Sequence, residues 1–322
     1  MSHPSSQTSP FEFRISSLFR IPSFGFRIFL IFLLPSLSLA DLPTAPPGFT
    51  LRELAPFDTN LVRLAAAPDH KSLYAMSTSG DVWQVDLATG AKTSIFTGSS
   101  YAGGGSVLGL AATPDNRLYI VSNIPDASVE PNLNRVIIFR TSSFSGGPQG
   151  RAPLPADPKP WFQTTYPYGV DTFNHGVSKI ALGPDGFLYV SSGSRTDHGE
   201  ARHQEHHSTE GEVPLTGCLW RLDPAAEHPQ VEIFAAGIRN AFGFCFDDHN
   251  QLFATENGPN ADAPEELNLL QPNHHYGFPY RFSTMTTSLY ADQPSLPLNL
   301  KIDLPILNDG PAGGATLSTF EP

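Results

Sequence analysis

The chain has 322 residues, of which 40% are hydrophobic and 16% are charged, so it can build a large core and is too apolar for a disordered or coiled-coil protein. Its 27 glycines and 31 prolines exclude an all-helical bundle, because both residues interrupt helices and favour turns between short strands. The formal net charge of -12 excludes a general nucleic-acid binder, and two cysteines are too few for a disulfide framework or a four-cysteine zinc site.

The first forty residues predict an export signal. An apolar run at residues 28–34 follows Arg14, Arg20 and Arg27, and small residues precede a cleavage site before Asp41. The run is shorter than the roughly 20 residues that span a bilayer. An uncleaved membrane anchor is the alternative. We expect a signal peptide at residues 1–40, a periplasmic or extracellular mature protein, and no stable membrane span after cleavage.

One pattern then recurs four times, at residues 65–76, 110–121, 180–191 and 244–255. Each copy has a small or apolar stretch, a Pro-Asp or Asp-Asp pair, a few turn residues, and a second apolar stretch led by Leu-Tyr or Leu-Phe. Each predicts two strands joined by a tight turn in which Asp, Asn or Gly tolerates a positive φ. Further strands are expected in four segments, residues 80–90, 134–140, 217–224 and 231–237. Repeated units of this kind are typical of an all-β propeller, with the inner strand of each blade preceding the Pro-Asp turn.

Two insertions and a tail modify the repeat. The polar segments at residues 141–161 and 194–214 are predicted to be loops at one end of the propeller. Residues 296–307 are the last strand-like stretch and predict at most part of a fifth blade. Because a propeller must close to protect its edges, we expect a domain at residues 41–322 that holds four to five blades and is incomplete at its carboxyl end.

Residues 174–280 carry a more specific signal. The stretches FNHGVSKIALGPDGFLYVSSGS, VEIFAAGIRNAFGFCFD and ATENGPNADAPEELNLLQPNHHYGFPY resemble the glucose/sorbosone dehydrogenase family of soluble quinoproteins. The resemblance implies a six-bladed β-propeller. It also implies an enzyme that uses pyrroloquinoline quinone (PQQ), held by Ca²⁺, to oxidise an aldose at its anomeric carbon to the lactone.

The resemblance assigns roles to four residues near the cofactor. His175 matches the general base, a role that suits an imidazole because it can accept a proton near neutral pH. Arg239 and Asn240 match the pair that contacts the quinone oxygens, where a guanidinium can stabilise developing negative charge. Asn174 stands at a further cofactor contact that is an acid in the best-studied members. A satisfied loop histidine and a structural arginine are the alternatives.

The resemblance also assigns calcium ligands. Gly258 and Pro259 match residues whose backbone carbonyls hold the cofactor's Ca²⁺, a hard cation that takes oxygen ligands. Glu266 matches a carboxylate of a second, structural calcium site, to which the backbone of Tyr276 contributes. A two-residue insertion before Glu265 leaves that residue as an alternative ligand, and a solvated acidic loop is the alternative to coordination.

The spacing of these residues predicts where the site lies. His175 and Arg239 are one repeat apart, so adjacent blades are expected to bring them together on one face, near the turn at Gly258 and Pro259. Several cationic cofactor contacts of the family lie in later blades, past the end of this sequence. We therefore expect the 322-residue chain to bind the quinone poorly.

A cluster of histidines in the second insertion suggests a metal site, although a polar loop also collects histidines by chance. Its members are His198, His203, His206 and His207, with Glu200 and Glu205 among them. The two cysteines, Cys218 and Cys245, are expected to be buried free thiols, and a disulfide between them is the alternative.

Together these observations predict an exported PQQ- and calcium-dependent sugar dehydrogenase. Its partners would be a small sugar substrate and an external electron acceptor, without nucleic acid. The alternative is a non-catalytic sugar-binding or interaction propeller that has lost the cofactor. A metal-dependent lactonase would need a carboxylate-rich axial metal site, which the sequence does not display.

Overall fold

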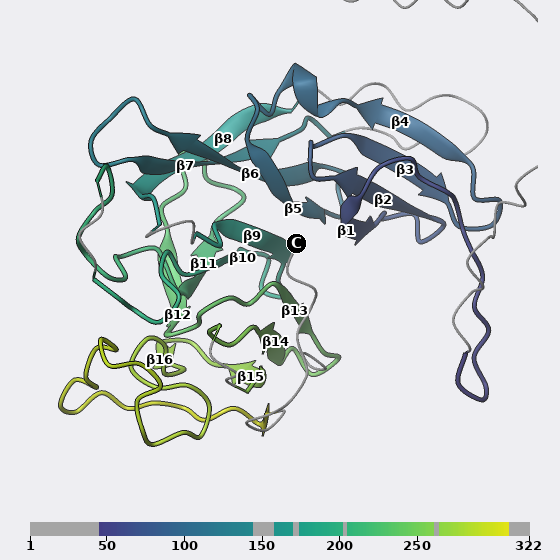
Figure 1. The fold of residues 1–322 in the computed structure, drawn as a ribbon. Coiled ribbons are helices and arrows are strands. Elements are labelled where there is room, and N and C mark those ends of the chain that lie inside the picture. Colours follow the sequence, from purple (N-terminus) through teal and green to yellow (C-terminus); the bar gives the residue numbers. More distant parts are fainter. Residues whose placement is uncertain (1–44, 144–157, 170–173, 202–204, 261–263, 309–322) are drawn as a thin grey trace, which may run out of the picture. The chain divides into compact units, whose positions relative to one another are not determined.

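Four sheets, antiparallel except for one short bridge, form the fold of the computed structural model (Figure 1). The model describes residues 45–308, apart from residues 144–157, 170–173, 202–204 and 261–263. The chain divides into two compact units, residues 1–51 and 52–322, and every element below belongs to the second. The predicted signal peptide at residues 1–40 lies outside the described residues. Within the described ranges, no helix is long and apolar enough to cross a membrane.

Each sheet, called a blade here, begins with strands that follow one another in the chain. Blade 1 contains, in order, β1 (Leu61–Ala66), β2 (Ser72–Ser77), β3 (Val82–Asp86) and β4 (Lys92–Phe96). Blade 2 contains β5 (Ser106–Ala112), β6 (Leu118–Asp126), β7 (Leu133–Arg140) and β8 (Lys159–Pro167). Blade 3 contains β9 (Val177–Leu182), β10 (Leu188–Ser192), β11 (Cys218–Leu222), β12 (Glu232–Ala236) and β16 (His274–His275). Blade 4 contains β13 (Gly243–Phe246), β14 (Leu252–Glu256), β15 (Glu266–Leu270) and β17 (Leu307–Asn308).

The repeated turns join the first two strands of every blade, as predicted. A residue with positive φ reverses the chain in each turn: His70, Asn116, Gly186 and Asn250. In the first turn the Asp69 carboxylate accepts hydrogen bonds from the backbone N–H groups of Lys71 and Ser72. These bonds satisfy backbone N–H groups of the turn that have no partner in the strand pairing. The need for such an acceptor explains why an aspartate recurs at this position.

The first strands of the blades lie innermost. Contacts join β1 to β5, β5 to β9, and β9 to β13, and Figure 1 shows the later strands of each blade further out. Buried apolar side chains pack between neighbouring blades, among them Tyr74 and Leu110 between blades 1 and 2. Val121 and Trp220 pack between blades 2 and 3. The all-β propeller predicted from the sequence is confirmed, with four blades in the described residues.

Two predicted segments differ from the structure. The loop predicted at residues 141–161 is wrong for its last three residues, which begin β8, because Lys159 and Pro160 pair with the end of β7. Residues 296–307 do not start a fifth blade, since Leu307 pairs with Leu267 as the outer strand of blade 4. The parallel bridge between β12 and β16 has no counterpart in the predicted pattern.

Both cysteines are free thiols, so the alternative of a disulfide is wrong. Cys218 is buried, as expected, and burial raises the pKa of its thiol to about 12. Cys245 is exposed, against expectation, because it takes the exposed position next to the buried Phe244 in the alternating strand β13.

Candidate functional site

His175 lies in the extended segment just before β9 and is held by Ser194, which follows β10. The His175 backbone N–H donates to the Ser194 carbonyl over 3.0 Å, and Nδ1 lies 3.1 Å from the Ser194 hydroxyl oxygen. That hydroxyl donates its own proton to the Thr196 carbonyl over 2.7 Å. Its lone pairs therefore face Nδ1, which favours the tautomer with the proton on Nδ1 and a lone pair on Nε2. An imidazole in this tautomer can accept a proton at Nε2.

His175 and Asn240 both lie close to the backbone of Gly193. A Cβ atom at Gly193 would lie 2.4 Å from the His175 Cβ and 3.3 Å from the Asn240 Oδ1. Since real Cβ contacts do not approach 2.4 Å, only glycine fits without displacing the histidine.

Arg239 is 1% exposed and lies on the other side of Ser194, whose backbone N–H donates to the Arg239 carbonyl over 2.7 Å. Its guanidinium donates from Nη2 to the Asp197 carboxylate over 2.8 Å and from Nε to the Asp197 carbonyl over 2.9 Å. A third bond runs from Nη1 to the Asn257 carbonyl over 3.0 Å. His175 and Arg239 thus contact the same residue, as their spacing in the sequence predicts.

Asp197 is the counter-charge of Arg239 in this site. Its burial, the largest influence, acts to raise the pKa of Asp197, but hydrogen bonds from the Asn260 backbone and the Arg239 guanidinium bring the pKa below the ordinary value. The Tyr290 hydroxyl also donates to this carboxylate, over 2.9 Å. Asp197 is therefore ionised at neutral pH.

The turn at Gly258 and Pro259 lies against this ion pair. The residue before the turn, Asn257, accepts from Arg239, and the residue after it, Asn260, donates its backbone N–H to Asp197 over 3.0 Å. Both ends of the turn are thereby fixed to the ion pair of Arg239 and Asp197.

Next to this network, β14 and β15 carry two glutamates directly opposite each other. Glu256 and Glu266 are register partners, and the Asn268 amide donates to both carboxylates, over 3.1 and 2.9 Å. Both side chains are buried, and burial raises the pKa of Glu266 to about 7. Burial and the negative charge of Glu266 raise the pKa of Glu256 well above its ordinary value. The Arg239 backbone N–H donates to Glu256, which joins this pair to the site.

Of the predicted calcium ligands, Glu266 is the more deeply buried of the two adjacent acids, whereas Glu265 is only partly buried. Tyr276 directly follows β16. Its hydroxyl donates to the Leu269 carbonyl over 2.8 Å, and its backbone N–H donates to Ala236 of blade 3 over 2.9 Å. These contacts hold the Tyr276 side chain at the end of β15, whereas Glu266 begins that strand.

Sequence reasoning missed Gly193, Ser194 and Asp197. The segment that contains Ser194 and Asp197 was predicted to be a polar loop, and it is a loop, but Ser194 and Arg195 are fully buried. One signal could have found these residues. The segment directly after the buried strand lacks helix- and strand-forming residues, and loops in such places often carry functional side chains.

The three described histidines of the predicted metal cluster have separate partners. His198 stacks on Tyr290 with ring centroids 3.6 Å apart and lies 2.9 Å from Asp292. His206 instead contacts Glu130, and His207 contacts the Gly169 carbonyl. His203 lies outside the described residues. Among the described residues, three His, Cys, Asp or Glu side chains come close enough to share one metal ion only at Asp247, Asp248 and His249, in the exposed turn of blade 4.

Comparison with known proteins places this site in a wider context. A family model described as Glucose / Sorbosone dehydrogenase matches residues 62–293. The chain is 22% identical to quinoprotein glucose dehydrogenase B of Acinetobacter calcoaceticus over 279 residues, which are 75% of this chain and 56% of that protein. It thus spans little more than half the length of this curated relative.

Solved structures share the fold. The PQQ-bound form of an aldose sugar dehydrogenase from Streptomyces coelicolor aligns with a TM-score of 0.55 and 26% identity, covering 82% of this chain and 73% of that one. The apo form of the soluble aldose sugar dehydrogenase from Escherichia coli aligns with a TM-score of 0.50 and 16% identity, covering 78% and 72%. The second likeness supports the fold alone.

Proposed function

The chain belongs to the glucose/sorbosone dehydrogenase family, and on that premise we propose that it is a PQQ- and Ca²⁺-dependent oxidoreductase that oxidises an aldose or related sugar to the lactone. One observation carries the proposal: His175, in the tautomer that suits a general base, lies beside Asn240, Arg239 and the turn at Gly258. The family membership and the PQQ-bound relative support the cofactor.

The residues of the site fit PQQ, an anionic quinone that carries carboxylates. The Asn174 Oδ1 is a buried polar atom with no hydrogen-bond partner among the described residues, and Asn174 directly precedes the proposed base. Asn174, Arg239 and Asn240 are the residues proposed to hold the cofactor. When bound, it supplies a two-electron oxidant next to His175.

The residues also fit calcium. Glu256 and Glu266 place two buried carboxylates opposite each other, and the Asn268 Oδ1 nearby is buried and has no hydrogen-bond partner in the described chain. Hard oxygen atoms of this kind suit Ca²⁺ better than softer metals. We propose Glu266 and the Tyr276 backbone as ligands of a structural ion, and the carbonyls of Gly258 and Pro259 as ligands of a second ion beside the cofactor.

Three residues of the chain have separate roles in the proposed reaction. His175 takes the proton of the anomeric hydroxyl at Nε2 while the hydride leaves the anomeric carbon. The Ser194 hydroxyl and carbonyl hold the Nδ1 proton and keep the ring in place, so no tautomer change is needed during the step. The guanidinium of Arg239, fixed by Asp197, supplies positive charge where the transition state gains negative charge.

The partners and the location follow from the same proposal. The reaction yields two electrons per sugar, so an external electron acceptor is required. The segment at residues 1–40 supports export to the periplasm or the outside of the cell. Nucleic acid is not proposed as a partner, because a chain with a formal charge of -12 lacks the positive charge that binds phosphates.

The second candidate is a propeller that binds sugar without the cofactor. It is favoured by the state of Arg239, which is 1% exposed and donates three hydrogen bonds within the chain. A guanidinium held in this way by contacts within the chain can serve a structural role without a cofactor.

A variant of the proposed base tests the function. The protein is reconstituted with PQQ and Ca²⁺ and assayed by dye reduction with a panel of aldoses. We expect His175→Ala to lower turnover by on the order of 10² to 10⁴-fold and to leave PQQ affinity nearly unchanged, because proton transfer belongs to the transition state. His249→Ala, at an exposed turn of blade 4, is the matched control.

Full activity in His175→Ala would remove the base assignment. Absence of PQQ binding to the unaltered protein, with sugar binding retained, would favour the non-catalytic propeller.

A further inference from the structure

A pocket of about 560 Å³ lies between blades 3 and 4. Blade 3 contributes Tyr189 of β10 and Phe234 of β12 to its lining. Blade 4 contributes Phe246 at the end of β13, Gln251 just before β14 and Gln271 just after β15. The volume lies within the range of small-molecule sites, about 300 to 1,000 Å³.

This pocket is separate from the candidate active site. In blade 4 it is lined by Leu252 and Leu270, which pair with each other at one end of β14 and β15. Glu256, which accepts from the backbone N–H of Arg239, lies at the other end of β14. Four residues along a strand span about 13 Å, so a ligand in the pocket would not occupy the space beside the candidate active site.

Aromatic rings form the apolar part of the pocket. The ring of the buried Tyr189 lies 5.0 Å from the ring of Phe234 and 5.1 Å from the ring of Phe246, measured between centroids. Both contacts are edge-on, with interplanar angles of 76° and 74°. These contacts hold three rings from three strands in place, while Phe234 and Phe246 remain partly exposed. Aromatic surface of this kind can pack against the C–H groups of a ligand.

Amide side chains adjoin this aromatic surface. Asn250, Gln251 and Gln271 line the pocket and are exposed. Within the described ranges, none of these three side chains forms a hydrogen bond with another residue. Each amide offers an oxygen acceptor and two N–H donors, whereas a hydroxyl group both donates and accepts. The amides therefore match a ligand that carries several hydroxyl groups.

The charge in the pocket is already compensated. Asp185 is the one carboxylate among the lining residues, which include no lysine, arginine or histidine. Its side chain forms an ion pair with Arg221 over 2.6 Å and accepts from the Tyr189 hydroxyl over 3.0 Å. The lining therefore favours a neutral ligand over an ionic one.

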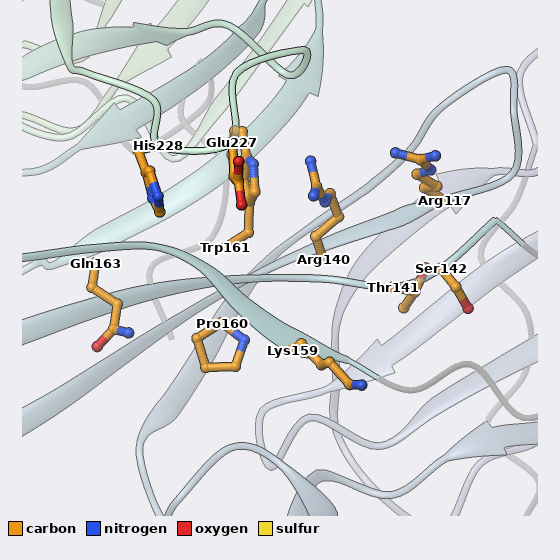
Figure 2. Close-up of a pocket in the computed structure, with 10 residues that line it drawn as sticks. All are labelled: Arg117, Arg140, Thr141, Ser142, Lys159, Pro160, Trp161, Gln163, Glu227 and His228. Atoms are coloured by element: carbon orange, nitrogen blue, oxygen red, sulfur yellow. The ribbon is translucent and has the colours of Figure 1, made fainter.

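A second pocket, of about 620 Å³ between blades 2 and 3, has a different lining (Figure 2). Figure 2 shows Arg140 and Lys159 pointing away from each other, and Arg117 forms an ion pair with Asp115 over 2.9 Å. Gln163 is the one amide side chain among the residues labelled there. These charged groups do not converge on one ligand, but Gln163 offers a matched control for the amides between blades 3 and 4.

We propose that the pocket between blades 3 and 4 binds a neutral carbohydrate. Its ring C–H groups pack against Phe234 and Phe246, and its hydroxyl groups form hydrogen bonds with the amides of Gln251 and Gln271. A sugar ring combines an apolar face with hydroxyl groups at its edge, and the pocket offers a surface for each. The proposal does not depend on dehydrogenase activity, since it uses no residue of the candidate active site.

Titration with defined sugars tests the proposal. Glucose, maltose and cellobiose are added separately to the full chain in the absence of PQQ, and binding is followed by calorimetry. We expect saturable binding of at least one of the three sugars. Tighter binding of a disaccharide would identify an oligosaccharide as the ligand, and tighter binding of glucose a free monosaccharide.

Three pocket variants and one control complete the test. Gln251→Ala and Gln271→Ala should each weaken binding by about threefold to tenfold, the effect of one lost hydrogen bond. Both side chains are exposed, so these variants remain informative if the third, Phe246→Leu, fails to fold. Phe246→Leu keeps an apolar side chain but removes the flat ring, and it should weaken binding as well. Gln163→Ala removes an exposed amide from the pocket in Figure 2 and should leave affinity unchanged.

Two results would overturn the proposal. The first is the absence of saturable binding of any of the three sugars. The second is an affinity that the pocket variants leave unchanged, or that they lower no more than Gln163→Ala does, because the sugar would then bind elsewhere on the chain.

Discussion

At the scale of single residues, the protonation of His175 depends on a neighbour that has no charge of its own. The Ser194 hydroxyl donates to a carbonyl over 2.7 Å and is therefore an acceptor toward the imidazole. A serine in this position selects a tautomer without shifting charge, so the ring can gain a proton during a reaction and lose it afterwards. An aspartate there would instead stabilise the protonated ring through its negative charge.

Gly193 gives the first prediction at this scale. Gly193→Ala places a Cβ atom where the His175 Cβ lies 2.4 Å away, so the histidine must move. We expect turnover of the reconstituted protein to fall by roughly 10²-fold or more, because a displacement of about 1 Å can cost that much. The unfolding midpoint should fall by only a few degrees. Gly186→Ala, in a turn where the new Cβ meets no atom within 4 Å, reports the cost of backbone strain alone.

An unchanged rate in Gly193→Ala would show that the position of His175 does not matter to the reaction. Equal losses of rate in both glycine variants would point to general destabilisation.

At the scale of elements, β14 and β15 place two acidic side chains in register. Glu256 and Glu266 are opposite each other in a buried part of blade 4, where repulsion between two ionised carboxylates would be weakly screened. Three donors reduce the cost: the Asn268 amide and the backbone N–H groups of Arg239 and Ser283. A divalent cation would neutralise the pair more completely than these dipoles.

Calcium should therefore stabilise blade 4. We expect Ca²⁺, added to chelator-treated protein, to raise the unfolding midpoint by several degrees, since a ligand at 100 times its dissociation constant contributes about 2.7 kcal/mol. Glu266→Gln should remove most of this shift. Glu232→Gln changes an exposed glutamate of blade 3 and should retain it. The measurement is thermal unfolding with Ca²⁺ and with Mg²⁺, and a shift of equal size in Glu266→Gln would rule out this site.

The elements differ in how well the sequence predicts them. The first two strands of each blade are predictable, because Asp69 and its equivalents mark the turn between them. The strand β8 is not predictable from its sequence, because Pro160 and Pro167 near its two ends suggest loops. The two-residue strands β16 and β17 have no pattern of their own, since their pairing depends on blades already formed.

At the scale of the whole unit, Asp197 connects parts that are distant in the chain. Its carboxylate accepts from Arg239, Asn260 and Tyr290, which lie 42, 63 and 93 residues away in sequence. The sequence resemblance could identify Arg239 because a family motif surrounds it, but no local pattern specifies which carboxylate will contact it. The partner of a buried charge is decided by the packing of blades.

This connection predicts a pH dependence of stability. The pKa of Asp197 is lower in the folded chain than the ordinary value of about 3.9, so its contribution is fully present above that value and is lost as the pH falls through the folded pKa. We expect Asp197→Asn to lower the free energy of unfolding by roughly 3 kcal/mol at pH 7, the effect of breaking a buried ion pair. The difference from the unaltered chain should shrink below about pH 4.

Urea unfolding at several pH values measures this difference, with Asp248→Asn as the control. The Asp248 side chain is 89% exposed at the turn of blade 4, so its removal should have little effect at any pH. A difference for Asp197→Asn that stays constant from pH 7 to pH 3 would mean that the carboxylate charge contributes nothing.

The path of the chain after β15 affects how blades 3 and 4 unfold. It first adds β16 to the outer edge of blade 3 and then returns to blade 4 as β17. One continuous length of chain thus belongs to two blades and joins their outer edges. We expect blades 3 and 4 to behave as a single cooperative folding unit, so their slowest-exchanging backbone amides should share one opening event.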